Sequence, residues 1–119
     1  MHNQSHVTYL KKYGWTIKQF SSEMKYDAGS LSSYEERMRQ VKNEAQLDLS
    51  PYRNKAVTET AYVLHENING YNHVKVYIFE SDHTIIGAYL ALNHERLDND
   101  KYKIIEGEIL PMNAFRGGN

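Results

Sequence analysis

The amino-acid sequence predicts an α+β domain in which two short-to-medium helices pack on one face of a mainly antiparallel sheet of four to five strands. Two stretches in the first half of the chain carry apolar residues at helical spacing. From residue 56 onward, apolar and polar residues alternate as they do in strands, and the links between the strands are short and polar, which favours antiparallel neighbours. A length of 119 residues fits one domain. We expect this domain to span residues 1–115 and residues 116–119 to form a disordered tail.

The first helix is predicted over residues 5–14. Ser5 can cap its N-terminus, and Gly14 can adopt the left-handed conformation that follows many helix ends. Residues 15–20 then alternate in polarity, which predicts the first strand.

A second helix is predicted from Ser33 to about Gln46. Ser33 and Glu36 have the spacing of a capping box, in which two side chains satisfy exposed backbone amides at the helix start. Four residues form the apolar stripe of this helix: Tyr34, Met38, Val41 and Ala45. Pro51 ends the helical region, because proline disfavours helix at the residue before it.

The remaining chain is expected to form four strands joined by turns. The strands cover residues 56–65, 73–80, 85–92 and 102–109, with turn signals at residues 66–70, 81–83 and 97–100. In the 73–80 strand an aliphatic set alternates with a second set that is mostly aromatic: Val74, Val76 and Ile78 against Lys75, Tyr77 and Phe79. If the helices cover the aliphatic face, the aromatic face looks outward or toward a partner.

Composition excludes several classes of protein. A net charge of -1 lacks the positive field of a nucleic-acid-binding domain, so we expect no nucleic-acid partner. The absence of cysteine excludes disulfides and thiolate metal sites. No apolar run reaches the ~18–20 residues of a membrane helix, so no membrane span is expected in this chain. The N-terminus lacks the basic and apolar segments of a signal peptide, which is typical of a cytoplasmic protein or of one whose leader has been removed.

Fold-making residues between positions 9 and 92 form a pattern. They comprise residues 10–17 (LKKYGWTI), Tyr34, Glu35 and Gln40, residues 47–55 (LDLSPYRNK), Thr60, Tyr62 and Val63, and residues 76–79 leading into residues 85–87. This pattern resembles the bacterial domain of unknown function 4830. The family often has glycine where Asn54 stands and a second glycine where this chain has Ala88.

The resemblance implies a location rather than an activity. Such domains resemble the extracytoplasmic part of small envelope proteins of Gram-positive bacteria, held by a lipoprotein signal or a single membrane anchor. The chain is therefore expected outside the cytoplasm, anchored through a segment that is not in this sequence, although a cytoplasmic location stays open. No activity is established for the family, so no functional residue is carried over from it.

Ten tyrosines indicate a binding surface more than the six histidines indicate a reaction. Tyrosine supplies rigid contact area with a polar tip and is enriched at recognition surfaces. The candidate ligand-binding residues are aromatic residues of the sheet: Tyr62, Tyr77, Phe79 and Tyr89. Ordinary sheet packing is the alternative interpretation, because tyrosine also has high strand propensity.

Two turns carry the residue types of a reactive site. His65 and His73 flank one turn and, with Glu66, supply the ligand types of an open zinc site. Glu80, Asp82 and His83 share another turn, where a carboxylate can orient an imidazole for acid–base chemistry. A polar hairpin end explains either group equally. No nucleotide-binding or hydrolase motif is present, and we expect no cofactor and no catalytic residue.

The sequence therefore leaves the function unknown and favours a non-enzymatic binding or docking domain of a bacterial envelope protein. Its partner would be an envelope protein or a cell-wall component. One alternative is a small enzyme or metal site that uses the 65–73 and 80–83 turns. Another is a structural or inhibitory domain that offers an edge strand, over residues 102–109, to a partner.

Overall fold

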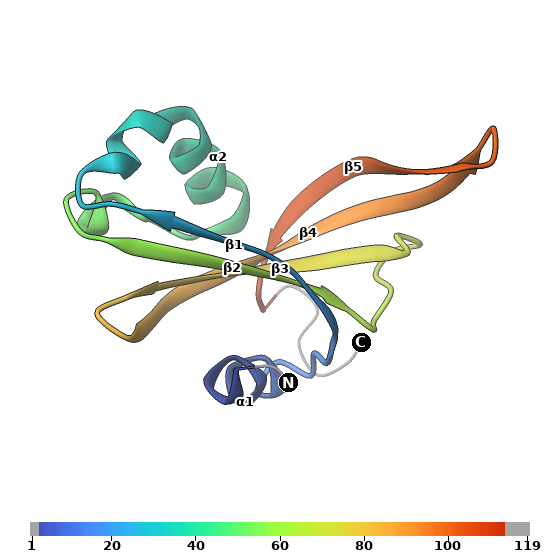
Figure 1. Ribbon diagram of the computed structural model, residues 1–119, viewed down its shortest axis with the longest axis horizontal. Helices are drawn as coiled ribbons and strands as arrows, with labels where there is room; N and C mark the ends of the chain where they lie inside the picture. Colours follow the sequence, from blue (N-terminus) through green and yellow to red (C-terminus); the bar gives the residue numbers. More distant parts are fainter. Residues whose placement is uncertain (1–2, 114–119) are drawn as a thin grey trace.

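The computed structural model describes residues 3–113, and the predicted tail over residues 116–119 lies outside this range. Five strands form one antiparallel sheet in which the order of the strands follows the order of the chain (Figure 1). The strands are β1 (Ile17–Tyr26), β2 (Val57–Leu64), β3 (His73–Ser81), β4 (Thr84–Asp98) and β5 (Lys101–Pro111). The helices are α1 (Gln4–Lys11) and α2 (Glu35–Ala45), with 3-10 turns at η1 (Ser30–Tyr34) and η2 (Ser50–Tyr52). The predictions of an α+β domain and of an antiparallel sheet are confirmed.

The helices lie on opposite faces of the sheet, so the prediction that both cover one face is wrong (Figure 1). Leu10 of α1 belongs to a core cluster with Val76, whereas Val41 of α2 belongs to a second cluster with Phe79 and Tyr89. Successive side chains of a strand point to opposite faces. Each face of this sheet carries large apolar or aromatic side chains, and each therefore needs a covering layer.

Neither predicted N-cap is formed, whereas Gly14 adopts the predicted left-handed conformation with a φ of 86°. The side chain of Asn3, rather than that of Ser5, accepts hydrogen bonds from the first amides of α1, at 2.8 and 3.3 Å. The chain enters α2 directly from the 3-10 turn, so no capping bond forms from Ser33 or from the N-cap residue Tyr34. Helix α2 ends at Ala45, close to the predicted end at about Gln46, and Gln46 adopts a left-handed conformation with a φ of 57°.

Strands β1 and β4 are longer than predicted. The last part of β4, residues 93–98, pairs with the first part of β5 and forms a long hairpin. Asn99 and Asp100 close this hairpin with φ values of 52° and 64°. Two consecutive positive φ angles match the right-handed twist of the flanking strands, and asparagine and aspartate tolerate them best after glycine.

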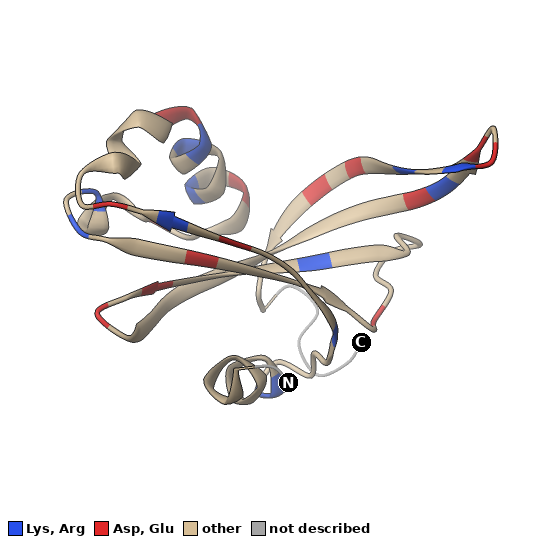
Figure 2. Cartoon of the chain, in the orientation of Figure 1, with Lys and Arg blue, Asp and Glu red and all other residues tan. Residues whose placement is uncertain are grey.

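Charges of both signs are interspersed over the helices and strands (Figure 2). Within the described range, no helix is long and apolar enough to cross a membrane. Gly87 packs directly beneath Leu47, where a Cβ would clash with a methyl group of that leucine. This contact gives a packing reason for two residues of the fold-making pattern between positions 9 and 92.

Candidate functional site

The most exposed apolar side chains lie on the β4–β5 hairpin, which projects beyond the rest of the sheet (Figure 1). We call residues 94–105 the arm. The Tyr102 side chain is 72% exposed and that of Leu97 is 62% exposed. Ile104 and Ile105 are exposed as well. A two-stranded hairpin with its apolar side chains in water is only marginally stable, so a further contact on this face would stabilise it.

Three of these side chains share one face of the arm. Leu97 lies directly opposite Tyr102, and Ile104 lies opposite Glu95. The register shift near the base of the arm places an extra residue in β5, so the alternation along β4 continues unbroken. The face with Leu97 therefore continues the face of the sheet that α2 covers farther along.

The base of the arm is fixed by the loop between β2 and β3. The side chain of Asn72 takes the place of a neighbouring strand, accepting a bond from the Glu95 amide at 2.6 Å and donating to its carbonyl at 3.1 Å. The Tyr71 ring stacks on His94 at 4.5 Å between centroids. Gly107 allows this packing, because a Cβ there would clash with the Tyr71 ring and with the Leu92 carbonyl.

A cavity of about 180 Å³ lies on the α2 side, where the arm leaves the sheet. It is lined by residues of α2, β3, β4 and β5: Arg37, Gln40, Lys75, Tyr77, Ala91, Asn93, Ile104, Glu106, Gly107, Glu108 and Ile109. Its charged lining is balanced, with two cations and two carboxylates. Since Ile104 belongs both to this cavity and to the apolar face of the arm, the two features form one continuous surface.

Arg37 joins α2 to the aromatic face of the sheet beside this cavity. Its guanidinium donates a hydrogen bond to the Tyr89 hydroxyl and lies 5.9 and 5.8 Å from the ring centroids of Tyr77 and Tyr89.

Burial raises the pKa of Tyr89 to about 12, although the nearby charge of Arg37 lowers it in part. Burial also raises the pKa of the Glu59 carboxyl, which accepts a bond from Tyr26 at 3.3 Å. Both tyrosines under Arg37 are therefore neutral near pH 7, and the cluster holds α2 to the sheet.

A second polar cluster lies on the α1 side of the sheet. It is not among the sites that the sequence predicts. His6 is 2% exposed, its Nδ1 atom lies 2.6 Å from the Tyr62 hydroxyl, and its Nε2 atom lies 2.6 Å from Oε1 of Glu80. A carboxylate, an imidazole and a phenol in series are the parts of a proton relay. Tyr62 is only 3% exposed, so its hydroxyl is shielded from a substrate, and the cluster ties α1 to β2 and β3. The spacing of His6 from Leu10 along the buried stripe of α1 is the one signal that could have revealed it.

Comparison with known proteins bears on the fold. The family model described as Domain of unknown function (DUF4830) matches residues 9–90. The chain belongs to this family. No curated protein and no solved structure matches the chain. The match ends within β4, so the arm and β5 lie beyond the part that defines the DUF4830 domain.

The DUF4830 domain does not place the four predicted ligand-binding residues on one surface. Tyr62 lies on the α1 face, whereas Tyr77, Phe79 and Tyr89 lie on the α2 face. Phe79 and Tyr89 are buried, and Tyr77 is half-buried at the cavity beside the arm. The expectation that the aromatic face looks outward is wrong, because α2 covers it.

Two residues of the predicted metal site, Glu66 and His73, interact with other residues through their side chains. The backbone amide of exposed His65 donates to the Thr16 carbonyl at 3.0 Å, and Glu66 accepts bonds from Thr16. Nδ1 of His73 lies 3.9 Å from the Glu95 carboxylate; burial lowers the pKa of His73, and Glu95 offsets part of this effect. Over residues 3–113, no group of three or more histidines and carboxylates could hold a metal ion.

The 80–83 turn does not assemble the predicted acid–base group. Glu80 bonds to His6, and the Asp82 side chain is 86% exposed in solvent. Asp82 and His83 instead shape the turn, with φ values of 52° and 63°. Their positions are those of a tight hairpin turn.

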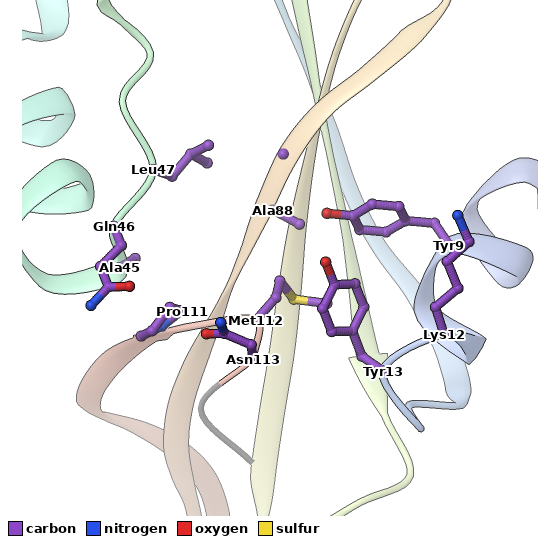
Figure 3. A pocket seen from close by; sticks show the side chains of 11 residues that line it. Tyr9, Lys12, Tyr13, Ala45, Gln46, Leu47, Ala88, Pro111, Met112 and Asn113 are labelled. Atoms are coloured by element: carbon purple, nitrogen blue, oxygen red, sulfur yellow. The ribbon is translucent and has the colours of Figure 1, made fainter. Parts of the chain in front are cut away.

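A larger cavity of about 480 Å³ wraps around β4 near Ala88 (Figure 3). Tyr9 of α1 and Tyr13 in the turn that follows it line one side of the strand, and Leu47 lies on the other side. Burial raises the pKa of the Tyr9 phenol, and the neighbouring Tyr13 adds to this effect. The described lining includes Lys12 but neither a carboxylate nor an imidazole.

Proposed function

We propose that this DUF4830 protein is a non-enzymatic docking domain that presents its arm to a partner protein. The observation that carries the proposal is the placement of exposed apolar side chains. Of the seven large exposed hydrophobic residues in the described range, four lie on the arm. Clusters of exposed apolar side chains mark interaction sites in folded proteins.

The edge of β5 supplies the second element of the proposed site. Within residues 3–113, β4 is the only strand that pairs with β5, so half of the backbone N–H and C=O groups of β5 face away from the sheet. An extended segment of a partner can add to such an edge as a further strand. Leu97, Tyr102 and Ile104 would then contact the side chains of that segment. The proposal therefore joins two predictions, a docking domain and an exposed edge strand. The docking surface is the β5 edge and not the aromatic face of the sheet, which α2 covers.

We also propose that docking takes place outside the cytoplasm, at the bacterial envelope. The family resemblance supports this location, with the domain held by an anchor that is not in this sequence. Protease added to intact cells that make the full-length protein should remove the domain. Protection that lasts until the cells are lysed would contradict the location.

A photo-crosslinking amino acid at position 102 tests docking directly in the cells that make the protein. Tyr102 is exposed on the arm, and Phe20, which is 54% exposed on the opposite edge strand β1, is the matched control position. We expect a discrete adduct from position 102 and none from position 20. The absence of an adduct at position 102, or the same adducts from both positions, would refute docking through the arm.

A further inference from the structure

The cavity of about 180 Å³ beside the arm, which we call the base cavity, is hollowed at Ala91. Lys75, Ala91 and Ile109 form one row across β3, β4 and β5, and all three line the cavity. Because alanine is short, the middle of the row is open, and Arg37 and Gln40 of α2 border the opening. The space has room for roughly six water molecules or more, at ~30 Å³ of liquid volume each, which suits a ligand of only a few carbons.

The charged side chains of the base cavity are sorted by element (Figure 2). The cations are Lys75 on β3 and Arg37 on α2, and the carboxylates are Glu106 and Glu108 on β5. Lys75 is half-buried, whereas the two glutamates are exposed. Strand β4 separates β3 from β5, so the two outer backbones lie about 10 Å apart. The cavity therefore has a cationic side and an anionic side.

These four side chains do not neutralise one another. None of the ion pairs among residues 3–113 joins two of them. Arg37 donates to the Tyr89 hydroxyl, which leaves most of its five N–H donors for other partners. Charges of opposite sign that border one cavity without pairing are satisfied by water or by a ligand of complementary charge.

A buried amide adds a neutral polar group to the base cavity. The Asn93 side chain lines the cavity and is 7% exposed. In the part of the chain that the structure describes, its one side-chain hydrogen bond runs from Nδ2 to the Ala91 carbonyl at 3.4 Å. An asparagine side chain can donate two hydrogen bonds and accept two more, so its oxygen is left for a ligand. Buried polar groups normally have partners, and a ligand in the cavity supplies this one.

We propose that the base cavity binds a small zwitterion that carries one ammonium group and one carboxylate, as a free amino acid does. The carboxylate lies toward Lys75 and Arg37, and the ammonium group lies toward the two glutamates of β5. Hydrogen bonds between charged partners are the strong ones, so both ends of the ligand contribute to binding. A simple anion meets the repulsion of the glutamates, and a simple cation meets that of Lys75 and Arg37. This inference goes beyond docking through the arm and does not depend on it.

Nuclear magnetic resonance titration of the ¹⁵N-labelled full chain tests the proposal. The probes are L-alanine and γ-aminobutyrate, which differ in the separation of their two charges. We expect one or both to shift the backbone amides of residues 91–93 and 106–109 in a saturable way. Propionate lacks the ammonium group and alanine amide lacks the carboxylate. Each should bind about tenfold more weakly, because it loses the hydrogen bonds of one charged end.

Substitutions locate the binding and separate it from folding. Lys75→Gln and Glu106→Gln keep the size of the side chain and remove its charge, so each should weaken amino-acid binding about tenfold. Ala91→Leu fills the hollow and should abolish binding. The matched control is Lys101→Gln, on the same strand as Glu106 but outside the cavity lining, which should bind like the wild type. Circular dichroism establishes that each variant is folded.

Several results would overturn the proposal. The first is the absence of saturable shifts with both amino acids. The second is propionate or alanine amide binding as tightly as the amino acids, which would indicate a site for a simple ion. The third is Lys75→Gln or Glu106→Gln binding like Lys101→Gln, which would place the ligand elsewhere. Crosslinking from position 102 tests docking separately, so the two proposals can fail independently.

Discussion

Replacing His6 with alanine removes the side chain that ties α1 to the sheet. The imidazole is buried and bonds at 2.6 Å to both the Tyr62 hydroxyl and the Glu80 carboxylate. Alanine would leave the partly buried carboxylate without this donor and would open a small void between α1 and the sheet. The free energy of unfolding should therefore fall.

The size of the loss follows from these contacts. A hydrogen bond to a charged group contributes about 1.5–3 kcal/mol, and the neutral bond to Tyr62 contributes about 1 kcal/mol. Tyr62 has a further interaction besides the bond to His6, so we take the second value as an upper bound. We expect a total loss of about 2–4 kcal/mol, a large fraction of the ~5–15 kcal/mol of a typical domain. For a chain of this size the melting temperature should drop by roughly 10 °C or more.

Urea unfolding and a thermal melt followed by circular dichroism measure both quantities. The matched control is His65→Ala at an exposed position, which should change stability by less than about 0.5 kcal/mol. Equal, small effects of the two substitutions would refute the conclusion that the His6 cluster anchors α1.

Three other perturbations test further parts of the structure. Replacing Gly107 with alanine forces a Cβ against the Tyr71 ring and a backbone carbonyl, and should cost about 1–3 kcal/mol in urea unfolding; an unchanged midpoint would contradict the packing at the base of the arm. Burial raises the pKa of Tyr89 from 10.0 to about 12, so the neutral form is favoured in the folded state and stability should fall as pH rises from 10 to 12. Tyr89→Phe should flatten that decline, which unfolding at a series of pH values measures, and an unaltered slope would count against the assignment. The free energy of unfolding of the double variant L97S/Y102S should lie within about 0.5 kcal/mol of the wild-type value, because both side chains are exposed. Crosslinking from other positions of the arm should nevertheless be lost in this variant. Retained crosslinking would argue for another docking surface.

The extent to which sequence predicted this fold depends on where side chains are buried. The β3 strand was predicted nearly to its ends, because Val74, Val76 and Ile78 are fully buried and enforce strict alternation. For the far half of β4, by contrast, the sequence predicts a turn at residues 97–100 and no strand beyond residue 92. Residues 94–98 are exposed or only partly buried. Burial therefore does not impose on them the alternation of apolar and polar residues from which a strand is predicted.

The arrangement of the helices could not be read from local patterns. Alternation shows that β3 has an aliphatic and an aromatic face, but it does not show which face a helix covers. Both faces are covered, and the predicted binding residues Phe79 and Tyr89 therefore became core. His6 was missed for a related reason, because its two partners lie 56 and 74 residues away along the chain.

Docking through the arm is the central claim, and the yield of crosslinking from position 102 relative to position 20 is its most direct measure. The account predicts a discrete, high-yield adduct from the arm position alone, mapped by mass spectrometry to one segment of the partner. Equal yields from the two edge strands, or no adduct from position 102, would contradict it.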